Sequence, residues 1–197
     1  TTTNTPPRDD ELVRAANANL TERELMKIAA VLGADVPVCL LDRPAIMVGT
    51  GTDVAPLEVM PSLSAVLVNP LVAAPANKTA SVFTQLAAKP LVQAPRGAMA
   101  VRDEWLANAT REGFIESLAA SRNDLEAPAM AVMPVIADVL DALAVLPGMR
   151  LARLSGAGPS CFALFDAMKD AEQAAAELRR TKPDWWVVAT SLQGSQS

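Results

Sequence analysis

Residues 151–165 constrain the fold more than any other part of the sequence. Two apolar runs, residues 151–155 and 161–165, have the length of buried strands, and small residues, Gly156-Ala157-Gly158-Pro159-Ser160, lie between them. Short apolar runs bounded by Gly and Pro are typical of strands joined by a turn. The sequence therefore predicts two adjacent strands around a glycine-rich loop.

The order of the expected elements around this pair sets the fold class. A strand is expected at residues 65–69, and a helix at 167–180 with a strand at 185–191 follows the pair. Helical spacing of apolar residues predicts one long helix from Asn123 to about Leu146, bent at Pro134. This order favours an α+β sandwich with helices on one face of an antiparallel sheet.

The part of the chain before Pro61 is predicted to form a separate lobe. Thr21 and Glu24 have the spacing of a capping box, which predicts a helix that ends at Gly33. Residues 35–41 are expected to be extended, and two short strands should follow. Pro61 is a plausible boundary, so we expect lobes at 1–60 and 61–197.

Composition excludes several kinds of chemistry. The 197 residues include no His, so a Ser-His-Asp triad, a His general base and a His-ligated metal are excluded. A net charge of −5 argues against a nucleic-acid-binding surface, and no apolar stretch is long enough to predict a membrane span. Cys39 and Cys161 lie in apolar runs and are expected to be buried thiols in a reducing compartment, the cytoplasm.

Two motifs combine turn-forming residues with groups that carry chemistry. Asp35 follows the helix end at Gly33, where a turn can hold a carboxylate rigidly toward a cleft or bond it within the turn itself. Ser155, Gly156, Ala157 and Gly158 form a loop whose backbone amides can approach an anion closely, although a plain hairpin turn explains the same residues.

Two further motifs lie where helices are expected to begin. Thr79 is placed to begin a helix, and Phe83 follows one turn later, either as a core residue or as a ring that stacks on a base. Asn123-Asp124-Leu125-Glu126 is expected to begin the long helix, with Asn123 and Asp124 as good capping residues.

In this order, the motifs resemble those of the 4-diphosphocytidyl-2-C-methyl-D-erythritol kinases of the GHMP kinase superfamily, over residues 21–191. The motifs are Leu32 to Val38, Ala45 to Gly51, Thr79 to Phe83, Asn123 to Glu126 and Leu154 to Phe165. The resemblance implies a ferredoxin-like C-terminal lobe together with the remaining part of an N-terminal lobe like domain 2 of ribosomal protein S5. It also implies a small-molecule substrate, ATP and Mg²⁺, with a homodimer as one possible assembly.

The resemblance also implies roles for individual residues. Asp35 matches the catalytic carboxylate, which accepts or orients the proton of the attacking hydroxyl. Thr79 and Phe83 match the substrate pocket, with Phe83 on the cytosine. Residues 155–158 match a glycine-rich turn beside the phosphates, and no residue is assigned to a metal.

The start of the sequence differs from the family pattern. Thr1 to Asn19 does not match the family's Gly/Ser-rich ATP loop, and the catalytic Lys segment that precedes this loop is also not found. We therefore expect a truncated form with little kinase activity alone. Two alternatives stay open: another GHMP kinase acting on a different alcohol, and a noncatalytic α+β binding module derived from such a kinase.

Overall fold

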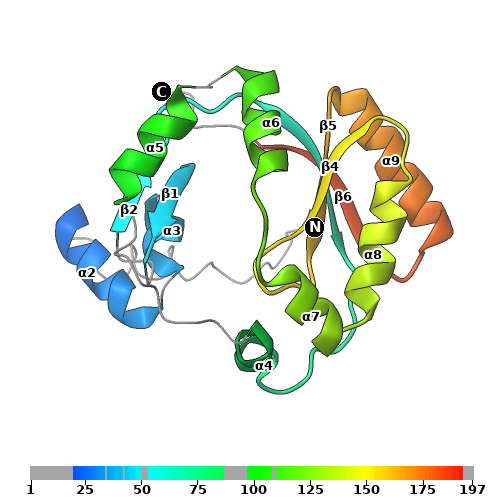
Figure 1. The fold of residues 1–197 in the computed structure, drawn as a ribbon, viewed down its shortest axis with the longest axis horizontal. Helices are drawn as coiled ribbons and strands as arrows, with labels where there is room; N and C mark the ends of the chain where they lie inside the picture. The colour runs from blue at the N-terminus through cyan, green and yellow to red at the C-terminus, as the bar shows by residue number, and fades with distance from the viewer. Residues whose placement is uncertain are drawn as a thin grey trace, which may run out of the picture. The chain divides into compact units, whose positions relative to one another are not determined.

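The computed structural model of the chain describes residues 20–33, 35–41, 43–49, 53–86, 97–107 and 110–192. The described residues group into two units (Figure 1). The first unit contains residues 20–60 and 97–107, and the second contains residues 61–86 and 110–192.

The first unit begins with helix α2 (Glu22–Leu32), whose start confirms the predicted capping box. The Glu24 amide donates to Thr21 Oγ1 at 3.4 Å, and the Thr21 amide donates to Glu24 Oε2 at 2.9 Å. These two bonds satisfy backbone donors that have no partner inside the helix. Gly33 ends the helix, as the sequence predicts.

Helix α3 (Val36–Leu41) corrects the extended run predicted over residues 35–41. Pro37 lies in its first turn, where the missing amide hydrogen costs no helical bond, and the Cys39 amide donates to the Asp35 carbonyl at 3.2 Å. Pro37 and Leu40 form the buried face of the helix, so Cys39 is exposed rather than buried as predicted.

A two-stranded antiparallel hairpin and one helix complete the first unit. Strand β1 (Ala45–Val48) pairs with β2 (Asp53–Pro56), and helix α5 (Ala98–Leu106) packs on both strands. Asp53 Oδ2 accepts a hydrogen bond from the Ala98 amide at 2.9 Å, which ties α5 to the hairpin. The predicted lobes, 1–60 and 61–197, place the residues of α5 in the second lobe, whereas the structure groups α5 with the first unit.

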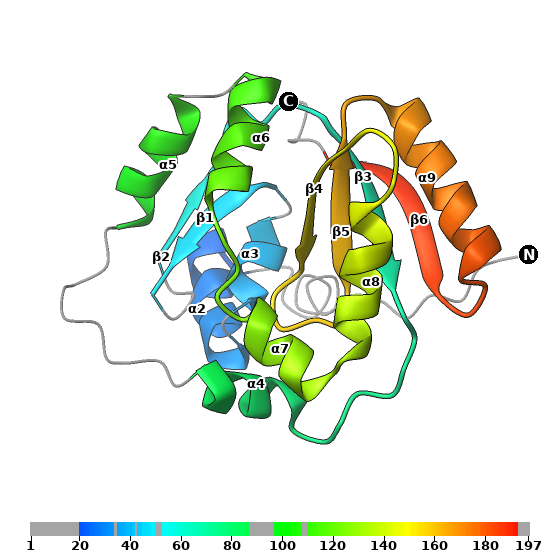
Figure 2. The same ribbon diagram turned by 45° about the vertical axis from the view of Figure 1, so that its right-hand side comes forward.

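The second unit contains a four-stranded antiparallel sheet in the order β4-β5-β3-β6 (Figure 2). Its strands are β3 (Leu63–Asn69), β4 (Met149–Leu154), β5 (Cys161–Phe165) and β6 (Trp186–Leu192). Its helices are α4 (Lys78–Leu86), α6 (Arg111–Ala120), α7 (Glu126–Val132), α8 (Val135–Ala144) and α9 (Met168–Thr181). The observed unit has the predicted α+β class.

The main core lies between one face of this sheet and helices α8 and α9. Val66, Val68 and Phe165 of the sheet pack there with Ile136 of α8 and Leu178 of α9. These side chains are almost fully buried, which makes the hydrophobic effect the main stabilising force of the unit.

Helix α6 lies on the opposite face of the sheet, whereas the sequence predicts helices on one face only. Side chains alternate along a strand, so Arg153 points away from the core that contains Leu154. Arg153 donates to the Leu118 carbonyl at 2.8 Å and to the Ser121 carbonyl at 2.9 Å, at the end of α6. Figure 1 shows α6 beside β4, away from α8 and α9.

Helices α7 and α8 replace the single bent helix that the sequence predicts. Met133 is the C-cap of α7, with φ −136° and ψ 87°, and Pro134 is the N-cap of α8. The proline ring disfavours helical geometry at the residue before it, so the helix is interrupted at Met133 instead of bending.

No helix in the described ranges is long and apolar enough to cross a lipid bilayer.

Candidate active site

The glycine-rich loop, residues 155–160, connects β4 to β5 in the predicted hairpin. The Ser155 amide donates to the Ser160 carbonyl at 2.9 Å, and the Gly158 amide donates to the Ser155 carbonyl at 2.9 Å. Gly156 has φ +55° and Gly158 has φ +72°, and the bond from Gly158 to Pro159 is cis. The loop is thus a compact turn that depends on left-handed glycine conformations.

Gly158 also lacks room for a side chain. A Cβ atom at this position would lie 2.7 Å from Leu154 Cδ1 and 3.1 Å from Ile136 Cδ1. Gly156 has no neighbour within 4 Å of a built Cβ atom. Close packing against β4 and α8 therefore holds one end of the loop, while the other end is open.

Asn123 binds the loop from the segment before α7. Its Nδ2 atom donates to the Leu154 carbonyl at 3.0 Å and to the Gly156 carbonyl at 2.8 Å. Its Oδ1 atom accepts a hydrogen bond from the Leu125 amide at 3.0 Å. The predicted capping role is wrong, because the cap of α7 is Leu125, and Asn123 connects the loop to the helix start instead.

Lys78, the first residue of α4, binds the next carbonyls of the loop. Its Nζ atom donates to the Ala157 carbonyl at 3.1 Å and also to the Gly158 carbonyl. A positive charge therefore lies at the loop.

These contacts turn the carbonyl groups of the loop toward the protein and leave two amides without an acceptor. In the part of the chain that the structure describes, the Gly156 and Ala157 amides donate to no protein atom. Successive free amides in a glycine-rich turn form a concave site that suits an anion, and the nearby Lys78 charge adds to the attraction. A phosphate group is one of the anions that suit such a site.

Glu126 and Cys161 complete the surroundings of the loop. Glu126 Oε2 accepts a hydrogen bond from the Leu154 amide at 3.0 Å, at the end of β4. Burial and then the Glu126 charge raise the pKa of the Cys161 thiol to about 12, so this cysteine stays protonated. The predicted burial of Cys161 is confirmed.

Thr79 and Phe83 lie four residues apart on α4 and both are exposed. Residues at this spacing occupy the same face of a helix. Phe83 is 54% exposed, so it is not a core residue; Val82 is the buried residue of this helix. The structure thus leaves an aromatic ring and a hydroxyl on one face of the helix that begins with Lys78.

Asp35 belongs to the first unit. Its side chain is exposed, and its carbonyl accepts the Cys39 amide at the start of α3. The turn after Gly33 therefore presents this carboxylate to solvent.

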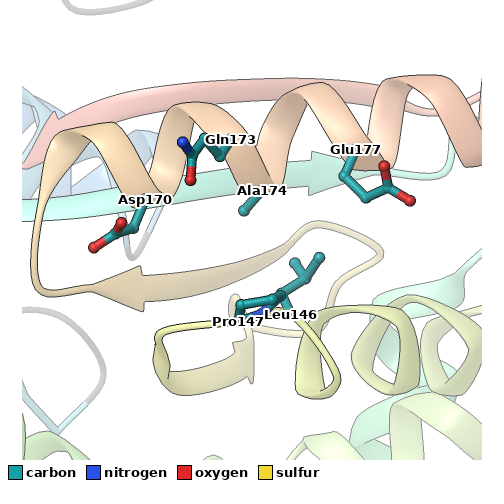
Figure 3. Close-up of a pocket in the computed structure, with 6 residues that line it drawn as sticks. All are labelled: Leu146, Pro147, Asp170, Gln173, Ala174 and Glu177. Atoms are coloured by element: carbon teal, nitrogen blue, oxygen red, sulfur yellow. The ribbon is translucent and has the colours of Figure 1, made fainter.

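A cavity of about 310 Å³ lies elsewhere in the second unit (Figure 3). It is lined by Leu146 and Pro147 after α8 and by Asp170, Gln173, Ala174 and Glu177 of α9. None of the predicted site residues lines this cavity. It is separate from the site built around the glycine-rich loop.

No group of three His, Cys, Asp or Glu side chains within the described residues could hold a metal ion. These residues therefore do not provide a three-ligand protein site for the Mg²⁺ that the resemblance implies.

Sequence reasoning did not find what holds the loop in place. The sequence pattern assigns no role to Lys78, and it indicates a helix start at Asn123 to Glu126 with Asn123 as a cap. The spacing of Asn123 and Glu126 indicates a helix start but does not identify their hydrogen-bond partners. These partners lie 28 to 33 residues further along the chain.

Known proteins with related sequences support the predicted resemblance. A family model described as GHMP kinases C terminal matches residues 106–184. The 4-diphosphocytidyl-2-C-methyl-D-erythritol kinase of Rhodopseudomonas palustris (strain HaA2) is 41% identical over 184 residues, which cover 92% of this chain and 60% of that protein. The protein of the same name from Bradyrhizobium diazoefficiens is 42% identical over 186 residues, with the same coverage. The chain thus spans about 60% of the length of these curated relatives.

Solved structures show the same relationship. The crystal structure of a 4-(cytidine 5'-diphospho)-2C-methyl-D-erythritol kinase matches with a TM-score of 0.65 and 28% identity, over 93% of this chain and 62% of that one. A homoserine kinase from Cytophaga hutchinsonii matches with a TM-score of 0.60 at 15% identity, over 95% of this chain and 62% of that one, which shows a shared fold alone. The chain is thus similar over most of its length to the 4-diphosphocytidyl-2-C-methyl-D-erythritol kinases, and residues 106–184 match the C-terminal family of the GHMP kinases.

Proposed function

We propose that this chain forms part of an ATP-dependent kinase that phosphorylates the 2-hydroxyl of 4-diphosphocytidyl-2-C-methyl-D-erythritol, a step of the non-mevalonate route to isoprenoid precursors. The names of the relatives support this substrate. In the reaction, the hydroxyl oxygen bonds to the γ-phosphorus of ATP, the bond to the β-phosphate oxygen breaks, and ADP leaves.

One observation carries the proposal: among the described residues, the Gly156 and Ala157 amides of the glycine-rich loop donate to no protein atom, while the loop carbonyls accept hydrogen bonds from Asn123 and Lys78. Phosphoryl transfer depends mainly on positioning and on donors directed at phosphate oxygens. We assign residues 155–158 to the phosphate groups at the active site.

The exposed face of α4 supports binding of the cytidine end of the substrate. The Phe83 ring is half exposed and follows Thr79 by one helical turn, so it offers an aromatic surface on which cytosine can stack. Thr79 adds a hydroxyl that can donate or accept a hydrogen bond.

Asp35 is proposed as the carboxylate that accepts or orients the proton of the attacking hydroxyl. The chain has no His, which leaves this role to an Asp, Glu or Lys side chain, and the resemblance to the kinase family assigns it to Asp35. Mg²⁺ would arrive with the nucleotide and would supply charge neutralisation of its phosphates.

Binding of CDP to the 197-residue chain tests the substrate assignment. Phe83→Ala should weaken CDP binding about 5- to 150-fold, because stacking on an aromatic ring contributes about 1–3 kcal/mol per base. Isothermal titration calorimetry with CDP measures the effect. Gln85→Ala, on the same helix and also exposed, should bind CDP as the wild type does.

Other outcomes separate the remaining candidates. Binding of ATP without CDP would favour a GHMP kinase with a different acceptor, and binding of neither would favour a noncatalytic module. The low activity of this chain alone, the homodimer and the cytoplasmic location stay predictions. An assay that follows ADP formed from ATP and the diphosphocytidyl substrate tests the first of these.

A further inference from the structure

The Asn123 side chain makes three hydrogen bonds to backbone groups from two segments. Two go from Nδ2 to the Leu154 and Gly156 carbonyls, at 3.0 and 2.8 Å, and one comes to Oδ1 from the Leu125 amide, at 3.0 Å. The side chain is partly buried, so these bonds are shielded in part from water. A single residue thus fixes the loop relative to the start of α7.

Only a carboxamide fits this pattern. An amide side chain offers two donor hydrogens and an acceptor oxygen, which match two carbonyls and one backbone amide. A carboxylate of the same shape would place a negative oxygen against two carbonyl oxygens. Asn123 is therefore more specific than a helix cap, a position at which Asp performs as well as Asn.

The contact with Gly156 determines the direction of a neighbouring amide. The Gly156 carbonyl and the Ala157 N–H belong to one planar trans peptide group, so they point in opposite directions. When Asn123 binds the carbonyl, the Ala157 N–H must face away from Asn123. The Ser155 carbonyl accepts a hydrogen bond from the Gly158 amide. The Gly156 N–H belongs to the same peptide group as this carbonyl, so it points away from the Gly158 amide.

We propose that Asn123 is a positioning residue that directs the Ala157 amide toward a phosphate group of the ligand. The inference rests on the proposed function, because it assigns the ligand of the loop to the phosphates of that reaction. Asn123 itself does not touch the ligand; it acts through the peptide group between Gly156 and Ala157.

Sulfate binding to the full 197-residue chain tests the proposal. The chemical shifts of the Gly156 and Ala157 amides in ¹H–¹⁵N spectra report binding at the loop itself. Asn123→Asp should weaken sulfate binding at least tenfold at neutral pH, because the introduced carboxylate repels the Gly156 carbonyl and the peptide group turns. Asp124→Asn is the matched control, since Asp124 is exposed and pairs with Arg122, and it should bind sulfate as the wild type does.

A pH series provides a readout that a merely structural role would not change. As the introduced carboxyl becomes protonated at low pH, it regains one donor, and sulfate affinity should recover toward that of the wild type measured at the same pH. Sulfate keeps its charge over this range, so the probe does not change. Asn123→Ser, whose hydroxyl is too short to reach both carbonyls, should be weak at every pH, and it provides a second variant if Asn123→Asp does not fold.

The outcomes separate the two proposals. If sulfate does not shift the Gly156 and Ala157 amides of the wild type, the assignment of the loop to phosphates is overturned, and this inference with it. If the wild type binds and both folded Asn123 variants bind equally well, the positioning role alone is overturned and the phosphate assignment stands.

Discussion

Gly158 shows how a single residue determines the shape of the site. The loop requires φ +72° at this position, and Leu154 and Ile136 occupy the space that a side chain would need. Gly156 has the same kind of backbone conformation with open space around it. The pair therefore separates the cost of the backbone conformation from the cost of crowding.

Gly158→Ala should lower the free energy of unfolding by about 2–5 kcal/mol, since a left-handed conformation costs roughly 1–2 kcal/mol and overpacking adds about 1–3 kcal/mol. Gly156→Ala is the matched control and should lose only about 1–2 kcal/mol, the backbone part. Urea denaturation followed by circular dichroism measures both variants. Equal losses would show that Leu154 and Ile136 move aside without cost.

Phe83 and Lys78 show which features of single residues can be predicted from the sequence. The position of the glycine-rich loop could be predicted, because Gly and Pro between two apolar runs are a local signal. The exposure of Phe83 could not, because an aromatic residue at helical spacing is compatible with either a core or a surface. The contact of Lys78 with Ala157 joins residues 79 positions apart, and no local pattern contains it.

At the scale of elements, the spacing of apolar residues predicts the helices and strands that pack on the core. Helix α9 is an example: Ala171, Ala174, Ala175 and Leu178 are buried at helical spacing, while the residues between them are exposed. Helix α3 was missed because Val36-Pro37-Val38-Cys39 has the composition of a strand, and six residues are too few to show a helical period.

The way α9 packs gives an element-scale prediction. Leu178 is 2% exposed and is the largest of the four buried side chains of the helix. Leu178→Ala should reduce the free energy of unfolding by about 2–5 kcal/mol, because a cavity forms between α9 and the sheet. Glu172→Ala, on the exposed side of α9, should change it by less than about 0.5 kcal/mol. A thermal melt of the two variants that gave the same midpoint would contradict this packing.

At the scale of the second unit as a whole, β3 holds the sheet together. It is the first strand of this sheet in the sequence but lies inside it, paired with β5 on one side and β6 on the other. Val66, for example, lies opposite Ala163 and also opposite Ala189. All of these pairings join residues that are far apart in the sequence.

Native-state hydrogen exchange should therefore find the slowest amides of the second unit in its two internal strands, β3 and β5. These amides are covered on both sides, so they exchange only when the sheet opens as a whole. Amides of β4 and β6, at the two edges of the sheet, should exchange faster. NMR-detected exchange in D₂O measures this order, and slower exchange in an edge strand than in β3 would contradict it.

The internal position of β3 has a consequence for how the chain is made. A ribosome adding about 5–20 residues per second needs roughly ten seconds to advance from β3 to the end of β6. Until β5 is made, Leu63–Asn69, an apolar segment that ends up buried, has neither of its partner strands, and it lacks one of them until β6 follows. The nascent chain is therefore a natural client for chaperones that shield extended apolar segments, and slowing translation between β3 and β6 would lengthen its exposure to aggregation.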